Sequence, residues 1–171
     1  LWNLGSRQLV DSWSTGSNWV TAVAFSRDGS ELATADERGM VHLWNLETRS
    51  EIAAFRASSI LVGILAFSPD GKTLATGTQT TETRVWNLAT RERLLDLGVI
   101  ANQVAFAPDG RLLVTCSVAG NEAQVWELPS GRRKAALKGH VGGMVQVSFS
   151  PDGLTLATGA YDGRIKLWNL A

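Results

Sequence analysis

The 171 residues carry sixteen basic and sixteen acidic side chains, and 44% of them are hydrophobic, as in an ordinary soluble protein of one domain. This balance argues against unspecific binding to polyanions, so we expect neither nucleic acid nor a membrane as a partner. No apolar run approaches the roughly 20 residues that cross a bilayer. The lone Cys116 cannot form an internal disulfide and fits a reducing compartment, so a cytoplasmic location is expected.

The chain is built from an internal repeat. The sequence "LWNL" stands at Leu1–Leu4, Leu43–Leu46 and Leu167–Leu170. Five of the seven tryptophans recur 40 or 42 residues apart, at Trp2, Trp44, Trp86, Trp126 and Trp168. A second series in the same phase opens phrases such as "FSPDGKTLAT", at Phe25, Phe67, Phe106 and Phe149. Two series in phase over four copies indicate four repeats of roughly 42 residues.

Each repeat is predicted to form strands. In "FSPDGKTLATG", Pro69 suits the first central position of a type I turn, and Gly71 tolerates the left-handed conformation that follows. The flanking apolar runs, one of which ends at the tryptophan, complete four antiparallel strands per repeat. We expect an all-β chain of one domain, 1–171. Its predicted parts are a partial blade at 1–17, full blades at 18–59, 60–98 and 99–139, and a blade lacking its last strand at 140–171.

One polar position recurs in the second strand of every repeat. A threonine fills it in all four copies, at Thr34, Thr76, Thr115 and Thr158. A polar residue held at one place in otherwise apolar strands suggests a recurring hydrogen bond.

These features resemble the WD-repeat β-propeller family, whose blades are four-stranded sheets arranged around an axis. The last repeat is closest, with Gly139–His140, Asp162–Gly163 and "IKLWN". The resemblance covers the whole chain, and "SPDGKTLATG" looks most like prokaryotic members. In the family a histidine, a Ser/Thr, an aspartate and the tryptophan form a structural tetrad. Here the matching residues are His140, Thr158, Asp162 and Trp168; the other repeats lack the histidine and the aspartate.

The sequence favours no catalytic or cofactor site, and we expect the chain not to be an enzyme. His140, Asp162 and a hydroxyl could mimic a hydrolytic triad, but no nucleophile-elbow motif is present, and the tetrad explains the same residues. Cys116 aligns with alanine and glycine, which indicates a small buried residue. Two histidines and one cysteine without ligand spacing predict no metal site. His42 occupies a position of varied residue type, two before the tryptophan, and is predicted to lie on a solvated rim.

The resemblance leaves binding as the expected function. The connections between repeats vary most, and loops on a rigid scaffold commonly carry function. Trp13 has no equivalent in the other repeats, and Trp19 aligns with Leu61, Ile100 and Gly143. Both tryptophans either pack on a neighbouring blade or lie exposed. The candidate partner-binding residues are Trp13, Trp19, Arg38, Gln79 and Tyr161, because aromatic residues and arginine dominate binding hot spots.

The strand count predicts an incomplete ring. The chain starts with the third and fourth strands of one blade and stops after the third strand of another, so we expect a partial propeller. It either belongs to a longer chain with further repeats or pairs with a second copy to complete a ring. The leading hypothesis is a non-catalytic scaffold that binds proteins or peptides on its loop face. The alternative is a sensory or regulatory segment of a larger protein such as a kinase or NTPase.

Overall fold

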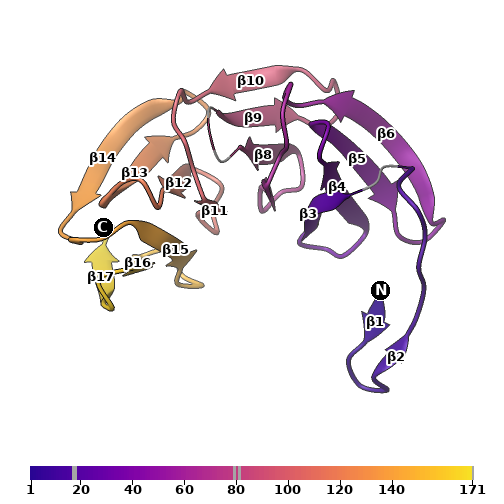
Figure 1. Ribbon diagram of the computed structural model, residues 1–171, viewed down its shortest axis with the longest axis horizontal. Coiled ribbons are helices and arrows are strands. Elements are labelled where there is room, and N and C mark those ends of the chain that lie inside the picture. Colours follow the sequence, from indigo (N-terminus) through magenta and orange to yellow (C-terminus); the bar gives the residue numbers. More distant parts are fainter. Residues whose placement is uncertain (17–18, 79, 81, 171) are drawn as a thin grey trace.

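The computed structural model describes residues 1–16, 19–78, 80 and 82–170, which form antiparallel sheets arranged as an open arch (Figure 1). A two-stranded hairpin comes first, β1 (Trp2–Asn3) and β2 (Gln8–Leu9). Three four-stranded sheets follow: β3 (Val20–Phe25), β4 (Glu31–Asp36), β5 (Met40–Asn45) and β6 (Ser50–Arg56); β7 (Ile64–Phe67), β8 (Thr73–Gly77), β9 (Thr83–Asn87) and β10 (Arg93–Asp96); β11 (Gln103–Phe106), β12 (Leu112–Cys116), β13 (Glu122–Glu127) and β14 (Arg132–Lys138). A three-stranded sheet closes the order: β15 (Met144–Phe149), β16 (Thr155–Ala160) and β17 (Ile165–Asn169).

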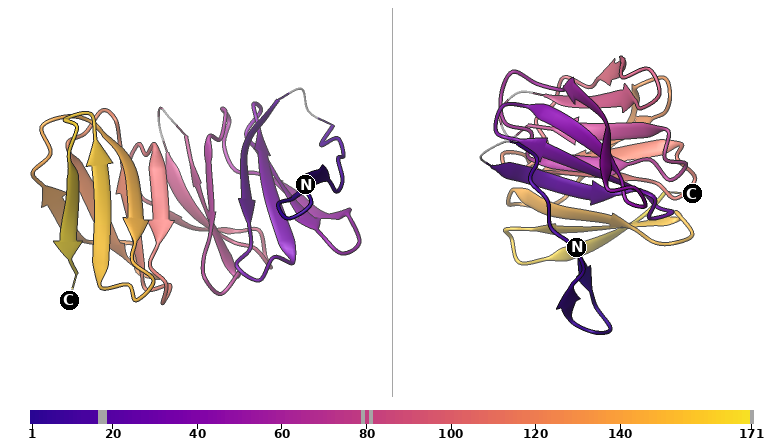
Figure 2. Two further views of the ribbon diagram at one scale, coloured as in Figure 1. Left: turned by 90° about the horizontal axis from the view of Figure 1, so that it is seen from below. Right: turned by 90° about the vertical axis from the view of Figure 1, so that its right-hand side faces the viewer.

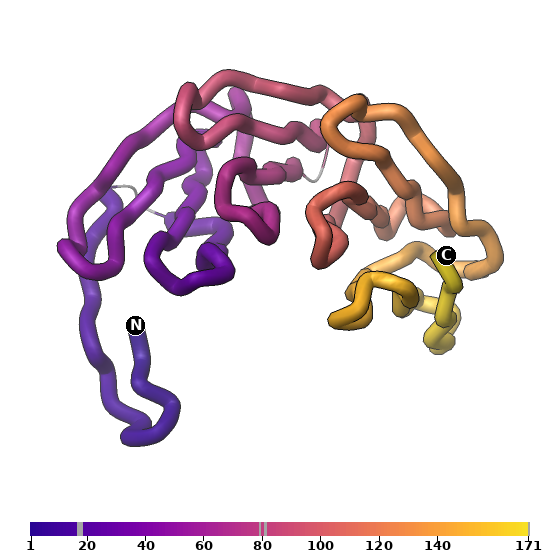
Figure 3. The backbone as a smooth tube through the Cα atoms, turned by 180° about the vertical axis from the view of Figure 1, so that it is seen from behind, coloured from indigo at the N-terminus to yellow at the C-terminus, as the bar shows by residue number. Residues whose placement is uncertain are grey.

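The prediction of an all-β partial propeller with four-stranded antiparallel blades is confirmed. Each four-stranded sheet runs from an inner first strand to an outer fourth strand (Figure 1), and neighbouring sheets stand side by side along the arch (Figure 2). The arch does not close on itself, and the hairpin β1–β2 projects from its first sheet (Figure 3). Within the described residues, no helix is long and apolar enough to cross a membrane.

The sheets pack through three apolar clusters, one between each pair of neighbours. In the cluster between the first two four-stranded sheets, Val41 and Leu43 of β5 meet Leu74 and Trp86 of the next sheet. The ring of Trp86 also lies 5.2 Å from that of Phe55 on β6. The other two clusters repeat this pattern. Each sheet therefore has two different faces. One carries the tryptophan of the third strand, and the other carries the remaining apolar side chains of that strand, such as Val41 and Leu43 on β5.

The turn between the first and second strands is held by an aspartate. Asp28 accepts hydrogen bonds from the Ser26 hydroxyl at 2.7 Å and from the backbone N–H of Ser30 at 3.0 Å. Asp70 repeats both contacts with Ser68 and Lys72. The glycine that follows, such as Gly71 with φ of 70°, takes the expected left-handed conformation.

These contacts predict an acid-sensitive carboxylate. The hydrogen bond from Ser26 is the main cause that lowers the pKa of Asp28 from 3.8 to about 2. A lowered pKa means that this stabilisation is present above about pH 4 and is lost as the pH falls toward 2. In Ser26→Ala we expect the pKa of Asp28 to move back toward 3.8, measured by carboxyl NMR titration, while the titration of Asp70 stays unchanged. An unchanged Asp28 titration would contradict the assignment.

Candidate functional site

The recurring threonine forms the same hydrogen bond in every sheet. The indole Nε1–H of Trp44 donates to the Thr34 hydroxyl at 3.0 Å, and both side chains are buried. The same bond, at 2.9 or 3.0 Å, joins the pairs Trp86–Thr76, Trp126–Thr115 and Trp168–Thr158. It satisfies the one polar atom of a buried tryptophan, so it serves the packing between sheets.

In the last sheet the structure brings the four predicted tetrad residues together. His140 lies with Nε2 2.9 Å from the Thr158 hydroxyl and Nδ1 2.9 Å from Asp162 Oδ2. Asp162 also accepts the backbone N–H of Val141 at 3.0 Å. This bond from Val141, aided by His140, lowers the pKa of Asp162 to about 2.

One assignment of hydrogens satisfies the whole network. Trp168 donates to the Thr158 oxygen, Thr158 donates to Nε2 of His140, and Nδ1–H of His140 donates to the Asp162 carboxylate. Both ring nitrogens of His140 are thereby occupied, and the Thr158 hydroxyl is buried. The arrangement has the residue types of a hydrolytic triad, but its hydroxyl is turned into the fold and offers no reachable nucleophile.

Cys116 is buried as well, and burial raises the pKa of its thiol to about 11. Within the described residues, no group of three or more histidine, cysteine, aspartate or glutamate side chains is placed to hold a metal ion.

The predicted solvated rim at His42 is wrong. The imidazole is largely covered: its Nδ1 lies 3.0 Å from Glu51 Oε2, and the ring stacks on Trp44. In the next sheet Arg84 occupies the same position, donates to the Ala57 carbonyl at 2.8 Å and pairs with Asp96. At this position His42 and Arg84 each bond to a carboxylate on the neighbouring strand, whereas the buried Oε1 of Gln124 in the third four-stranded sheet has no hydrogen-bond partner among the described residues.

Two kinds of connection lie along one edge of the sheets, and together we call them the loop face. It comprises the links between sheets, residues 57–63, 97–102 and 139–143, and the turns between second and third strands, residues 37–39, 117–121 and 161–164. Backbone hydrogen bonds join the two kinds: Ala57 N–H to the Gly39 carbonyl at 2.9 Å, and Tyr161 N–H to the Gly143 carbonyl at 3.0 Å. The links and turns thus support one another on rigid sheets.

Exposed apolar side chains occur in most of the links and turns of the loop face. Trp19 also belongs to this face, in the link that directly precedes β3, and its backbone N–H donates to the Glu37 carboxylate of the neighbouring turn at 3.1 Å. The large exposed apolar residues of this face, taken in chain order, are Trp19, Ile60, Ile100, Val118, Val141 and Tyr161. At the opposite edge of the sheets, the turns between first and second strands contribute Leu154 to the same class. The loop face therefore carries an apolar row that follows the arch from sheet to sheet.

The candidate partner-binding residues do not form one compact cluster. Trp19 and Arg38 are exposed on the first four-stranded sheet, whereas Tyr161 is exposed on the last sheet, at the other end of the arch (Figure 1). Gln79 lies outside the described residues. The sequence did not show how far apart these side chains lie along the arch.

The statement that Trp13 has no equivalent is wrong. Its ring packs on Trp44 with 6.0 Å between centroids, as Phe55 packs on Trp86 at 5.2 Å. Phe55 follows Trp44 by the same number of residues as Trp13 follows Trp2. Trp13 thus occupies the place of a fourth-strand residue in a preceding sheet. Counting from the tryptophan instead of the phenylalanine would have found this match.

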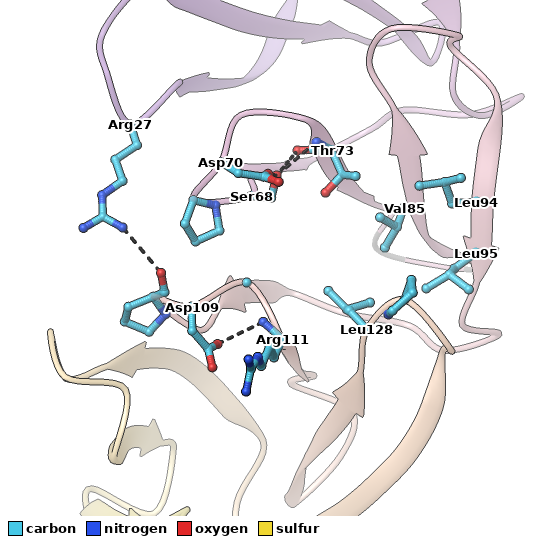
Figure 4. A pocket seen from close by; sticks show the side chains of 14 residues that line it. Arg27, Ser68, Asp70, Thr73, Val85, Leu94, Leu95, Asp109, Arg111 and Leu128 are labelled. Atoms are coloured by element: carbon cyan, nitrogen blue, oxygen red, sulfur yellow. Dashed lines mark hydrogen bonds between the residues drawn. The ribbon is translucent and has the colours of Figure 1, made fainter.

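A cavity of about 460 Å³ opens at the edge of the sheets opposite the loop face, between the β7–β10 and β11–β14 sheets (Figure 4). Val85, Leu95 and Leu128 form its apolar wall. The polar groups around it are engaged within the turns: Arg27 donates to the Pro108 carbonyl, and Asp109 accepts the N–H of Arg111 at 2.9 Å. This cavity lies where the interface between the two sheets opens to solvent, and its polar groups do not point toward a common site that could bind a ligand.

Three curated proteins are similar in sequence to all or part of this chain. The chain is 27% identical over 169 residues to "Guanine nucleotide-binding protein subunit beta" of Saccharomyces cerevisiae, an alignment of 99% of this chain and 39% of that protein. It is 39% identical over 66 residues to "Pre-mRNA-processing factor 19 homolog 2" of Arabidopsis thaliana (39% of this chain, 12% of that protein). It is 39% identical over 70 residues to "Eukaryotic translation initiation factor 3 subunit I" of Emericella nidulans (40% and 20%). These relatives are eukaryotic and give no support to the prokaryotic likeness of the turn phrase.

The family described as "WD domain, G-beta repeat" matches four segments, residues 7–45, 50–87, 98–127 and 131–169. Most of the matched segments begin in or near the fourth strand of one sheet and end with the third strand of the next. Four repeats in this frame leave the two-stranded hairpin at one end of the arch and the three-stranded sheet at the other. Matches over most of the chain, the repeated four-stranded sheets and the Trp–Thr bonds together show that this chain belongs to the WD-repeat family.

Proposed function

We propose that the chain is a non-catalytic interaction scaffold and that its loop face binds a protein or peptide partner. The observation that carries this proposal is the apolar row from Trp19 to Tyr161. Exposed aromatic and aliphatic side chains that line up on rigid elements are typical of protein interaction sites. Because the row extends over several sheets, an extended segment of a partner suits it better than a single side chain.

The relatives support an interaction role in a limited way. Two of them, "Guanine nucleotide-binding protein subunit beta" and "Eukaryotic translation initiation factor 3 subunit I", are named as subunits, that is, as parts of larger assemblies. The chain spans 39% of the first relative and 20% of the second. The similarity therefore supports a role for the repeats and says nothing about the activity of either whole protein.

The side chains of the types used in catalysis or metal binding are engaged in the fold, which supports a role without catalysis and without a cofactor. His140 and Thr158 are committed to the hydrogen-bond network, and the Cys116 thiol is buried with a raised pKa. A cytoplasmic location stays a prediction from the single cysteine.

A displayed peptide library tests the loop face directly. Peptides selected on the immobilised chain are expected to bind about tenfold or more weakly to Trp19→Ala and to Tyr161→Ala, because a central aromatic contact contributes more than 1 kcal/mol. Binding is measured by biolayer interferometry on each variant. Both side chains are exposed, so thermal unfolding of the two variants should match that of the unaltered chain.

The matched controls are Leu94→Ala on an outer strand and Leu154→Ala in the turns at the opposite edge of the sheets, both also exposed. These variants should retain the selected peptides. Peptides that lose affinity for the Leu94 or Leu154 variant, and keep it for the Trp19 and Tyr161 variants, would move the site off the loop face and overturn the proposal.

A further inference from the structure

The outer strand of the third four-stranded sheet, β14, is strongly basic. It carries Arg132, Arg133, Lys134 and Lys138 and no acidic residue. The outer strands β6 and β10 each carry one basic and one acidic residue. Because the whole chain has equal numbers of basic and acidic side chains, this concentration of positive charge is a local feature of one strand.

The charge on β14 is only partly neutralised. The cations at the two ends of the strand each have a carboxylate partner on β13: Arg132 lies 2.7 Å from Glu127, and Lys138 lies 3.7 Å from Glu122. Arg133 and Lys134 are exposed, and neither forms an ion pair with another described residue. These two cations are therefore available to carboxylates from outside the chain.

β14 is also an open edge of its sheet. It is the last strand in the order β11-β12-β13-β14, and in the described part of the chain no further strand pairs with it. It runs along the outer rim of the arch, so its free side points away from the neighbouring sheets (Figure 1). Alternate backbone N–H and C=O groups along such an edge have no partner in the sheet and can bond to an added strand.

The side chains along β14 favour one kind of added strand. Ala135, Ala136 and Leu137 form its half-buried centre. Basic residues precede this centre, and Lys138 follows it. Apolar side chains that face each other across two strands stabilise the pair, as do side chains of opposite charge. An added strand with an apolar centre and acidic ends would therefore complement β14.

We propose that an extended acidic segment of a partner protein adds to β14 as a fifth strand of this sheet. Its backbone bonds to the free edge, and its carboxylates face the cations at both ends of the strand. Basic side chains on a sheet edge also hinder unwanted pairing, but β6 and β10 are outer edges as well and carry balanced charge. Edge protection alone therefore does not explain the charge of β14. The outer rim is separate from the loop face, so this proposal does not depend on the proposed function.

A titration with a synthetic peptide tests the proposal. The probe Glu-Glu-Val-Val-Val-Glu-Glu, acetylated and amidated, matches the seven residues of β14 in length. It should shift the amide NMR signals of β14 in the ¹⁵N-labelled chain in a saturable way, and it should slow hydrogen exchange at the β14 amides that exchange rapidly in the free chain. The peptide Lys-Lys-Val-Val-Val-Lys-Lys should do neither. Shifts that gather elsewhere, or no saturable shift at millimolar peptide, would overturn the proposal.

Arg133→Glu and Arg93→Glu form a matched pair of variants. Both arginines are exposed on outer strands, and they lie opposite the equivalent residues Trp126 and Trp86. Arg133→Glu should weaken binding of the acidic peptide about fivefold or more, because repulsion between like charges replaces an attraction. Arg93→Glu, on β10, should keep the affinity of the unaltered chain. An Arg133→Glu variant that binds as tightly as the unaltered chain would contradict a site on β14.

A second acidic probe separates strand addition from attraction by charge alone. Glu-Glu-Val-Pro-Val-Glu-Glu has the same charge, but its proline lacks a backbone N–H and fits the interior of a strand poorly. It should bind about tenfold or more weakly than the valine peptide. Equal binding of the two acidic peptides would overturn strand addition. Tighter binding of a single-stranded thymidine oligonucleotide to β14 would overturn it too, because the strand would then be a site for nucleic acid.

Discussion

Replacing Trp86 by alanine is expected to lower the free energy of unfolding by about 3–5 kcal/mol, as for other large aromatic residues removed from a core. The ring is buried between two sheets, lies 5.2 Å from Phe55 and donates to the Thr76 hydroxyl at 2.9 Å. Its removal opens a cavity and leaves a buried hydroxyl with one partner fewer. Urea unfolding followed by circular dichroism measures the loss.

Trp2 provides the matched control, because it occupies the same position of the repeat without the packing. It is exposed in the hairpin β1–β2. In dilute solution Trp2→Ala should change the free energy of unfolding by no more than about 0.5 kcal/mol. Equal losses for the two variants would show that the repeated tryptophan acts through its own strand and not through the contact between sheets.

The repeat made the fold predictable. Two residue series in the same phase located the turns and the third strands, so the sheets and their strand order followed without any knowledge of packing. The threonine position was informative for the same reason: one polar residue at one place in four apolar strands needs a partner, and the tryptophan indole provides it. Positions repeated in all four copies reflect the packing between sheets.

Positions that occur in one copy, or that vary, were harder to interpret. Trp13 seemed unique because the sequence was aligned on the phenylalanine series, and the long link before β3 breaks that alignment; the contact with Trp44 restores it. At the position of His42, the varied residue types predict a solvent-exposed side chain. His42 and Arg84 at that position instead bond to carboxylates on the neighbouring strand, Glu51 and Asp96.

The loop face shows a further limit of the sequence. Its connections were recognised as variable, but which side chains lie near one another depends on how the sheets follow the arch. Tyr161 lies beside Gly143, where a Cβ would clash with the Val118 carbonyl. This close approach explains why the fourth repeat has glycine where Trp19, Leu61 and Ile100 stand in the others. The spacing of residues in the sequence does not predict such a contact between two sheets.

The second large effect is expected at His140. His140→Ala should lower the free energy of unfolding by about 2–4 kcal/mol, because the ring is buried and its loss leaves the Thr158 hydroxyl without the acceptor that it meets at 2.9 Å. The backbone at Val141 should also become more mobile. Its N–H donates to Asp162, and His140 holds that carboxylate in place. Urea unfolding measures the first effect, and hydrogen exchange of the Val141 amide measures the second.

The other histidine is the control for this network. His42→Gln places glutamine where Gln124 already stands in the third four-stranded sheet, so its effect should stay within about 1 kcal/mol. A His140→Ala variant as stable as His42→Gln would contradict a structural role for the network. The last sheet would then rest on the Trp168–Thr158 bond and on apolar packing, as the three four-stranded sheets do with their own tryptophans. Its histidine and aspartate would need another explanation, and their place beside Tyr161 and Val141 would make the loop face the first region to examine.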